Sequence, residues 1–311
     1  MPKRDEIRIR DPFILTDTEN KCYYMYGTTA LEAGSLRAKN TFSVYKSYDL
    51  ENFSEPTVIF DGGKAGFWAD KDFWAPEVHK YNGKFYLLVS LLGHNGLRGT
   101  QIAVSDTPCG PFVPIAPHAA TPLDRSCIDA SLFVSNGKPY IFYSLDWPDN
   151  FNEEKGAYVG SVWAVELTPD LKEEVGNPFC LFMSDECPIS KATPDRTTVY
   201  EGKPVVRYGS DAPFVQKLSN GSLFLTWSPY LNGNYVVLGV VSESGDVKGP
   251  WKHLSEPIFD GNGGHAMFFT DKDGRKIMCI HAPERDMDER AHLFNMVERE
   301  NKLEIIEELP I

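Results

Sequence analysis

The sequence lacks most features that mark membrane-spanning, disulfide-linked or redox proteins. Its 311 residues include six cysteines, and none of them shows the Cys-x-x-Cys spacing of metal sites or redox motifs. There is no apolar run of about 18 residues and no charged-then-apolar leader, so we expect neither a membrane span nor an export signal. The expected location is cytoplasmic, or periplasmic or secreted where a leader has been removed.

Positive charge is also scarce. The chain has 31 Lys and Arg against 44 Asp and Glu, which gives a formal net charge of -13. Binding to duplex nucleic acid or to an anionic membrane needs a basic patch, whereas the Lys and Arg residues here are scattered. These observations exclude nucleic acid and membranes as expected partners and favour a neutral or cationic ligand.

No long helical period appears, and the composition favours short strands. Aromatic residues make up 13% of the chain, which also contains 25 Gly and 22 Pro. A motif that begins with a turn residue and continues as an aromatic and aliphatic run recurs five times. The copies are NKCYYMYG from Asn20, GKFYLLVS from Gly83, GKPYIFYS from Gly137, GSLFLTWS from Gly221 and GRKIMCIH from Gly274.

Each copy is preceded by a second apolar run about eight to ten residues upstream, and this pairing predicts a β-hairpin. Two further strand-like stretches follow downstream. The upstream runs are DPFIL from Asp11, APEVH from Ala75, DASLF from Asp129, DAPFV from Asp211 and HAMFF from His265. The fold class predicted is all-β, a five-bladed β-propeller with four antiparallel strands per blade, forming a single domain over residues 1–311.

Loop lengths predict which face of the propeller carries the ligand-binding site. The loops between second and third strands, such as residues 28–40 and 145–157, are long, and so are the links between repeats at 61–74 and 183–210. In an up-and-down blade both sets emerge on the face where each first strand begins. We expect that face to carry the functional site.

The residues that open the five first strands should line the central channel on that face. These positions read Asp11, Ala75, Asp129, Asp211 and His265. Three carboxylates in one ring repel one another, which is costly unless their pKa values are driven apart, as acid and base roles require. The alternative is that each aspartate caps backbone N–H groups at a strand start.

The chain resembles glycoside hydrolase family 43 from Arg10 to about His281. The resemblance rests on Arg10-Asp11-Pro12-Phe13-Ile14, Phe73-Trp74-Ala75-Pro76-Glu77-Val78, Ile128-Asp129-Ala130-Ser131-Leu132-Phe133 and Gly263-Gly264-His265-Ala266-Met267. It implies a five-bladed propeller that hydrolyses arabinose- or xylose-containing plant glycans with inversion. It also implies an oligosaccharide or polysaccharide as partner and no required cofactor.

The resemblance implies roles for the ring carboxylates. Asp11 is similar to the general base that activates water, and Asp129 to the carboxylate that raises the pKa of the general acid. The family usually has Glu-Gly-Pro at the acid, whereas this chain has Asp211 before Ala and Pro. Asp211 and Glu186 are equal candidates for the acid, and Glu201 ranks behind them.

His265 and its neighbours carry the remaining expectations about ligands. In the resembling family, a histidine at this position holds an axial water or a cation, often calcium. We therefore expect a structural calcium ion or a buried, hydrogen-bonded histidine at His265, with no cluster of acidic residues that would specify calcium by itself.

His265 and five further residues are expected to contact the sugar. Trp74, Phe73 and Trp147 lie in or beside the long loops, where aromatic faces stack on sugar C–H groups, although core packing is the alternative for each. Arg10 lies next to the expected base, and Glu77 follows two residues after Ala75 on the same strand face. Both suit contacts to sugar hydroxyls.

Two other functions stay open. A propeller glycoside phosphorylase would replace water by phosphate, but that chemistry needs several cationic groups at the water position. A sugar-binding propeller without catalysis is the other alternative, and the aspartate in place of the usual glutamate at position 211 is its main support.

Overall fold

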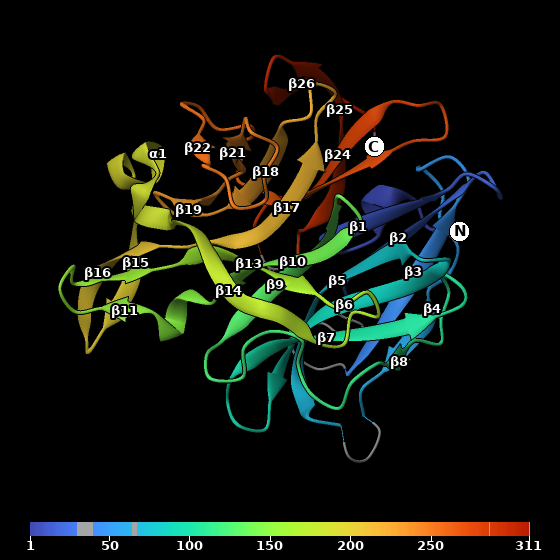
Figure 1. Cartoon of the computed structure of the whole chain (residues 1–311). Helices are drawn as coiled ribbons and strands as arrows, with labels where there is room; N and C mark the ends of the chain where they lie inside the picture. Colours follow the sequence, from blue (N-terminus) through green and yellow to red (C-terminus); the bar gives the residue numbers. More distant parts are fainter. Residues whose placement is uncertain (30–39, 64–66, 286, 311) are drawn as a thin grey trace. The chain divides into compact units, whose positions relative to one another are not determined.

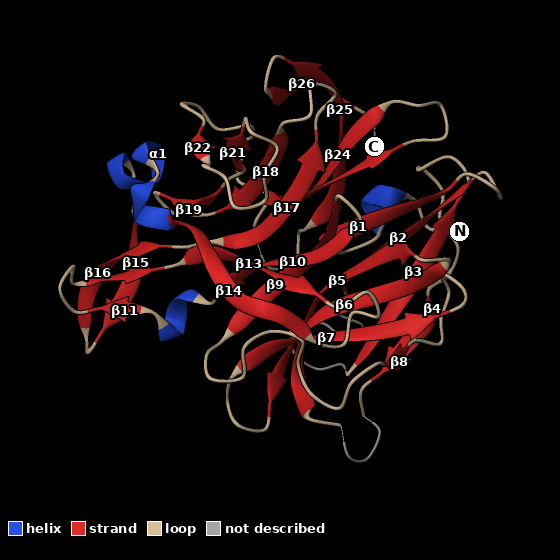
Figure 2. Ribbon diagram, in the orientation of Figure 1, coloured by secondary structure: helices blue, strands red, loops and turns tan. Residues whose placement is uncertain are grey.

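The computed structural model describes residues 1–29, 40–63, 67–285 and 287–310. Strands dominate this part of the chain, as Figures 1 and 2 show. The described helices are single turns: η1 (Arg4–Glu6), η2 (Trp147–Asp149), η3 (Ser184–Glu186) and α1 (Pro188–Ala192). None of these is long or apolar enough to cross a bilayer.

The described residues form six four-stranded sheets, and five of them follow one another along the chain, which we number sheet 1 to sheet 5. Sheet 1 contains β1 (Arg10–Asp17), β2 (Cys22–Thr28), β3 (Thr41–Ser47) and β4 (Thr57–Asp61). Sheet 2 contains β5 (Ala69–Tyr81), β6 (Lys84–Gly93), β7 (Arg98–Ser105) and β8 (Val113–Pro114). Sheet 3 contains β9 (Cys127–Ser135), β10 (Lys138–Leu145), β13 (Ser161–Leu167) and β14 (Glu174–Met183). Sheet 4 contains β17 (Asp211–Lys217), β18 (Leu223–Ser228), β21 (Leu238–Ser242) and β22 (Lys252–His253), and sheet 5 contains β23 (Gly264–Thr270), β24 (Lys276–Ala282), β25 (Arg290–Arg299) and β26 (Lys302–Glu308).

The repeated motif forms the second strand of each sheet, as predicted. Asn82-Gly83 and Asn136-Gly137 have positive φ at both positions, the geometry of the two-residue turns that match the twist of a hairpin. The second strands of the hairpins are largely apolar because most of their residues are covered on both faces, and every residue of β2 and of β18 is buried. The predicted hairpins therefore follow from turn chemistry and from burial of most of each second strand.

Two of the predicted long loops form a sheet of their own, which we call the accessory sheet. It consists of β11 (Phe151–Asn152), β12 (Ala157–Val159), β16 (Lys203–Tyr208) and β15 (Asp195–Tyr200), in that order. The link between β12 and β16 is a parallel pairing across more than 40 residues of sequence, which local patterns do not reveal. The loop interpretation was therefore wrong for most of 183–210, and residues 30–39 and 64–66 of the other long loops lie outside the described chain.

The chain divides into two compact units. Unit 1 comprises residues 1–124, 267–297 and 305–311, and unit 2 comprises 125–266 and 298–304. Each unit is described by itself below. Trp227 and Phe142 lie in the core of unit 2, and Phe42 and Tyr26 are buried in unit 1. The single domain over residues 1–311 stays a prediction.

Candidate active site

The first strands of the sheets share a backbone feature at their openings. Five non-glycine residues there have positive φ, between 47° and 58°: Asp11, Ala75, Asp129, Ala212 and His265. In sheets 1 to 4 this residue coincides with a break in strand register, so the position is a β-bulge. Residues held in this region of backbone space cluster at functional sites, because surrounding contacts must stabilise them.

The fourth of these positions corrects the predicted ring. Ala212, and not Asp211, has the positive φ. Asp211 pairs with Ser228 just as Arg10 pairs with Thr28. Asp211 is therefore equivalent to Arg10, one residue before the ring position. In the sequence alone, either Asp211 or Ala212 can be aligned with Asp11. The position of the bulge shows that Ala212 is the equivalent of Asp11.

In unit 1, the Asp11 carboxylate is held by a short chain of hydrogen bonds. The Thr28 hydroxyl donates to Asp11 Oδ2 at 2.9 Å, and its oxygen accepts the Ala75 N–H at 2.8 Å. Asp11 is 9% exposed, so its carboxylate is largely enclosed while one edge reaches solvent. A carboxylate that is fixed and still accessible is suited to take a proton from water.

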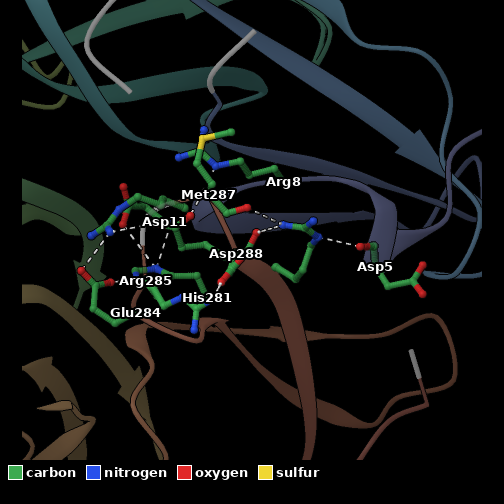
Figure 3. A network of polar contacts seen from close by, with 11 residues as sticks. Asp5, Arg8, Asp11, His281, Glu284, Arg285, Met287 and Asp288 are labelled. Carbon is green, nitrogen blue, oxygen red and sulfur yellow. Dashed lines mark hydrogen bonds and ion pairs between the residues drawn. The ribbon is translucent and has the colours of Figure 1, made fainter. Parts of the chain in front are cut away.

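The backbone and side chain of Asp11 also meet a network from the loop after β24 (Figure 3). The Asp11 N–H donates to His281 Nδ1 at 3.1 Å, and His281 Nε2 lies 2.6 Å from Glu284 Oε2. Arg10 completes the network, since its guanidinium donates to Glu284 at 2.9 Å and to Glu289 at 3.2 Å. The structure thus places Arg10 in ion pairs with carboxylates beside Asp11, and its predicted contact to sugar hydroxyls stays a prediction.

In unit 2, Asp129 and Asp211 lie at the openings of neighbouring first strands. Asp129 Oδ2 accepts the backbone N–H of Ala212 at 3.1 Å, which fixes the Asp129 carboxylate next to the residue that follows Asp211. Asp129 is 9% exposed, and Asp211 is partly buried. Two carboxylates brought together in this way do not ionise independently.

The charges around Asp211 favour its protonated form. Burial raises the pKa of Asp211 well above its usual range, and the negative charges of Asp129 and then Asp146 raise it further. Arg207 and His265 act in the opposite direction with smaller effects. A carboxyl group that holds its proton more strongly than a free one is suited to donate it, so the arrangement in unit 2 can perform general acid chemistry.

Arg207 is the cation of this cluster, and aromatic rings hold it in place. Its guanidinium carbon lies 4.6 Å from the Trp147 ring centroid and 4.4 Å from that of Tyr230. It also forms an ion pair with Asp195, whose side chain is completely buried. The accessory sheet, which supplies Arg207 and Asp195, therefore delivers a fixed positive charge to Asp211.

Asp146, Arg207 and His281 are among the members of these clusters that the sequence did not reveal. Asp146 directly follows the second strand of sheet 3, and its N–H donates to Ser126 at 3.0 Å. His281 ends the fifth copy of the repeat motif, where the other copies end in small residues, and that difference was a readable signal. Arg207 gave no such signal, because it reaches Asp211 through the accessory sheet.

Neither glutamate proposed as the acid is grouped with Asp211. The carboxylate of Glu186 accepts the Met183 N–H at 3.0 Å and so caps η3, and its charge acts on His253. Glu201 lies at the tip of the β15–β16 hairpin, where its φ of 48° belongs to a tight turn and its side chain is exposed. These placements favour Asp211 over both glutamates.

The two tryptophans predicted to stack on sugars are both partly exposed, and each already has an arginine on its ring. The guanidinium carbon of Arg98 lies 3.8 Å from the ring centroid of Trp74, and Arg207 lies over Trp147 as described above. A sugar would therefore use the remaining ring face or edge of each tryptophan. Their role in substrate binding stays a prediction.

Phe73 and Glu77 have contacts of another kind. Phe73 is 4% exposed and packs against Phe42 and Phe60, with ring centroids 5.8 and 6.3 Å away. This placement supports the core-packing alternative. Glu77 is 8% exposed and bonded to His79 at 2.7 Å. The bulge between Trp74 and Glu77 interrupts the alternation on which the predicted direction of Glu77 depended, so neither placement favours a sugar contact.

His265 is buried at the opening of β23, and its N–H donates to the Ser228 hydroxyl at 2.9 Å. No group of three or more His, Cys, Asp or Glu side chains in the described residues could hold a metal ion. The side chains around His265 therefore do not fit a cation cage built from protein alone, and we assign no chemical step to a metal.

Known proteins share this architecture over nearly the whole chain. The structure of an endo-arabinase from Bacteroides thetaiotaomicron VPI-5482 is 34% identical with a TM-score of 0.83, and the match covers 96% of this chain and 98% of that one. A β-xylosidase/α-arabinofuranosidase from a compost metagenome, in its calcium-free form with xylotriose, is 16% identical with a TM-score of 0.72, covering 98% and 97%. This second likeness concerns the fold alone.

Among curated proteins, an extracellular exo-α-(1→5)-L-arabinofuranosidase from Streptomyces avermitilis is 24% identical, over 94% of this chain and 58% of its own length. The chain spans 32% to 58% of the length of three of the curated relatives that it matches. The five four-stranded sheets and the structural likeness confirm the predicted fold class, an all-β five-bladed propeller. The model of glycosyl hydrolases family 43 matches residues 6–307, and the chain therefore belongs to that family.

Proposed function

We propose that this protein is an inverting glycoside hydrolase that acts on arabinose- or xylose-containing plant polysaccharides or oligosaccharides. The observation that carries the proposal is Asp211, whose pKa is raised by burial and by the carboxylates of Asp129 and Asp146. Membership of family 43 supports the same reaction class. A protonated carboxyl group and a separate ionised carboxylate are the two groups that inverting hydrolysis needs.

In the proposed reaction, Asp211 is the general acid. It donates its proton to the glycosidic oxygen as the bond between that oxygen and the anomeric carbon breaks. The leaving sugar departs as a neutral alcohol, and Asp211 is left as a carboxylate. Asp129 has the role of keeping that proton on Asp211 until the bond breaks, through its negative charge.

Asp11 is the general base of the proposed reaction. It takes one proton from a water molecule while the water oxygen forms a bond to the anomeric carbon from the opposite side. Hydroxide is thus delivered with inversion, and Asp11 becomes protonated. Exchange of one proton with solvent at each carboxyl group then restores both for the next turnover. The hydrogen bond from Thr28 holds one oxygen of Asp11, and so limits its rotation.

Arabinan is the first substrate to test. The endo-arabinase at 34% identity and the exo-arabinofuranosidase at 24% both act on arabinose-containing material according to their names. Xylan and arabinoxylan come second, because other relatives are described as xylosidase/arabinosidase or β-xylosidase. The chain's own substrate is therefore proposed as a class of pentose glycans.

We propose that any calcium bound near His265 has a structural role. The imidazole would supply one ligand nitrogen, and water molecules the others, since the described side chains form no cluster of three ligands. Added calcium should then raise the melting temperature without changing the anomer of the product, and a chelator should reverse that rise. Activity that is lost with the chelator at unchanged melting temperature would contradict a purely structural role.

The two alternative functions make different demands. A phosphorylase must bind phosphate with cationic side chains, but Arg10 is in ion pairs with Glu284 and Glu289, and Arg207 with Asp195. Such pairing supports water as the acceptor. A sugar-binding propeller without catalysis would have no use for a carboxyl group held protonated at Asp211.

The test is product formation from arabinan, arabinoxylan, xylan and 4-nitrophenyl pentosides by the wild-type protein and by Asp11→Ala. The proposal predicts release of reducing sugar without added phosphate, and a loss of at least about a thousandfold in Asp11→Ala. Turnover that needs phosphate would favour the phosphorylase. Binding of arabino-oligosaccharides without any product would favour the non-catalytic alternative.

A further inference from the structure

The link between the fifth and the first sheet, at His281, differs from the equivalent links that follow sheets 1 and 4. Thr28 and Ser228 end the second strands of sheets 1 and 4. The hydroxyl of Thr28 accepts the N–H of Ala75 at 2.8 Å, and that of Ser228 accepts the N–H of His265 at 2.9 Å. Each small hydroxyl thus pins the opening of the next first strand. At the corresponding place in sheet 5, the acceptor for Asp11 is the imidazole of His281.

The hydrogen bonds of His281 define its tautomer. A backbone N–H can only donate, so His281 Nδ1, 3.1 Å from the Asp11 nitrogen, must offer its lone pair. The proton of the neutral imidazole is then on Nε2, and it points to Glu284 Oε2 at 2.6 Å. His281 has no exposed side-chain surface, so the ring is also held by packing.

The next contacts continue from Glu284 to charged groups. Arg10 bonds to Glu284 at 2.9 Å and to the completely buried Glu289 at 3.2 Å, and Arg8 lies 3.3 Å from Glu289. These residues come from β1, from the segment before it and from the loop between β24 and β25, all within unit 1. The Glu284 carboxylate is therefore fixed from one side by Arg10 and accepts the imidazole proton on the other.

A serine at position 281 would be enough to accept a backbone N–H, as Ser228 does. The imidazole adds a connection that a hydroxyl does not have, because its second nitrogen ties the Asp11 backbone to Glu284 (Figure 3). Glu284 in turn bonds to Arg10, the neighbour of Asp11. Asp11 has a φ of 51°, a strained conformation for a residue with a side chain, so its backbone needs such support. The direction of the Asp11 carboxylate depends on that backbone.

We propose that His281, oriented by Glu284, is a positioning residue that holds Asp11 in the conformation in which its carboxylate works as the base. This inference rests on the proposed function, because it requires Asp11 to be that base. His281 does not touch the substrate in this account and transfers no proton. Its effect on the rate passes entirely through Asp11.

The inference predicts a split between kcat and KM. In His281→Ala, a displaced Asp11 should lower kcat roughly 10- to 100-fold, since a misplacement of about 1 Å can cost a hundredfold, while KM changes less than about threefold. His281→Asn keeps an acceptor oxygen near the Nδ1 position and should recover most of kcat. Glu284→Gln keeps an acceptor for Nε2–H but loses the charge that pairs with Arg10, so it should show a smaller loss than His281→Ala.

The closing experiment is a double-mutant cycle between His281 and Asp11 with 4-nitrophenyl α-L-arabinofuranoside and 4-nitrophenyl β-D-xylopyranoside as probes. Azide replaces water in the Asp11→Ala background: it attacks the anomeric carbon, 4-nitrophenolate leaves, and no base is needed. The inference predicts that His281→Ala changes this azide-dependent rate less than about twofold, although it lowers the rate of the enzyme with Asp11 at least tenfold.

Three outcomes would overturn the inference. His281→Ala could lower the azide-dependent rate as much as the rate with Asp11, His281→Asn could be as slow as His281→Ala, or His281→Ala could leave kcat unchanged. Failure of the proposed function gives a different result, because Asp11→Ala would then keep the wild-type rate without azide. All variants are compared below their melting temperatures. If His281→Ala does not fold, Glu284→Gln replaces it in the double-mutant cycle with Asp11→Ala.

Discussion

Asp129 accepts a hydrogen bond from the backbone N–H of Ala212, the residue immediately after Asp211, at 3.1 Å. One carboxylate thus fixes the strand that carries the second carboxyl group and also acts on it electrostatically. Burial is the largest cause of the raised pKa of Asp211, and the charge of Asp129 is the next. These two functions of Asp129 can be separated by mutation.

Asp129→Asn should move the basic limb of the pH profile of kcat/KM to lower pH. The amide oxygen can still accept the Ala212 N–H, but the negative charge is gone, so the pKa of Asp211 falls. The basic limb reports deprotonation of the essential acid in the free enzyme. Asp129→Ala also removes the acceptor and should reduce the free energy of unfolding by about 1–3 kcal/mol. A basic limb that stays in place in Asp129→Asn would contradict this coupling.

The stability of Asp211→Asn relative to the wild-type protein should increase as pH rises. The folded-state pKa of Asp211 is raised, so its contribution to stability is complete below the unfolded pKa of about 3.9 and is lost as pH rises through the folded pKa. Each unit of raised pKa corresponds to about 1.4 kcal/mol. The difference in melting temperature between Asp211→Asn and wild type should therefore increase from pH 4 to pH 8.

The matched control is Asp273→Asn, which changes an exposed carboxylate in the turn between β23 and β24. Its difference from wild type should stay nearly constant over the same range. If Asp211→Asn behaves like this control, Asp211 is not held protonated by the folded protein.

Arg207→Met should move the basic limb in the opposite direction, to higher pH. The guanidinium opposes the raised pKa of Asp211, so the acid holds its proton more strongly without it. The completely buried Asp195 also loses its ion-pair partner, which should cost about 3–5 kcal/mol of stability by chemical denaturation. The double variant Arg207→Met/Asp195→Asn should recover part of that loss. A shift to lower pH would show that Arg207 acts on a group other than Asp211.

Thr28→Val should impair Asp11 with little change in the volume of the side chain. The variant removes the hydroxyl that donates to Asp11 Oδ2 and accepts from the Ala75 N–H. A hydrogen bond to a charged group contributes about 1.5–3 kcal/mol, so we expect kcat to fall roughly 10- to 100-fold. Thr28→Ser keeps the hydroxyl and should stay within about threefold of wild type. Equal losses in the two variants would assign the effect to packing.

The sequence was sufficient for features that depend on local pattern. The turn at Asn136-Gly137 and the largely apolar, completely buried β2 are encoded by neighbouring residues, so the repeats and their hairpins could be recognised. The opening positions Asp11 and Asp129 were found in the same way, because each precedes a repeated apolar run.

Features that depend on distant contacts were not predictable. The shift of the ring position from Asp211 to Ala212 is set by a bulge, and a bulge inserts a residue without changing the apolar pattern. Arg207 reaches Asp211 because β12 and β16 pair in parallel across a long stretch of sequence. Glu186 appeared available as an acid in the sequence, whereas in the structure its carboxylate caps η3.

The central claim is that Asp211 is the general acid. It is tested most directly by measuring how much Asp211→Asn lowers kcat/KM for substrates with different leaving groups. Protonation matters for a sugar leaving group and much less for 4-nitrophenolate, which departs without a proton. We predict that Asp211→Asn lowers kcat/KM for arabino-oligosaccharides at least about a hundredfold more than for the 4-nitrophenyl pentoside. Equal losses on both substrates, or the same selective loss in Glu186→Gln in place of Asp211→Asn, would contradict the account.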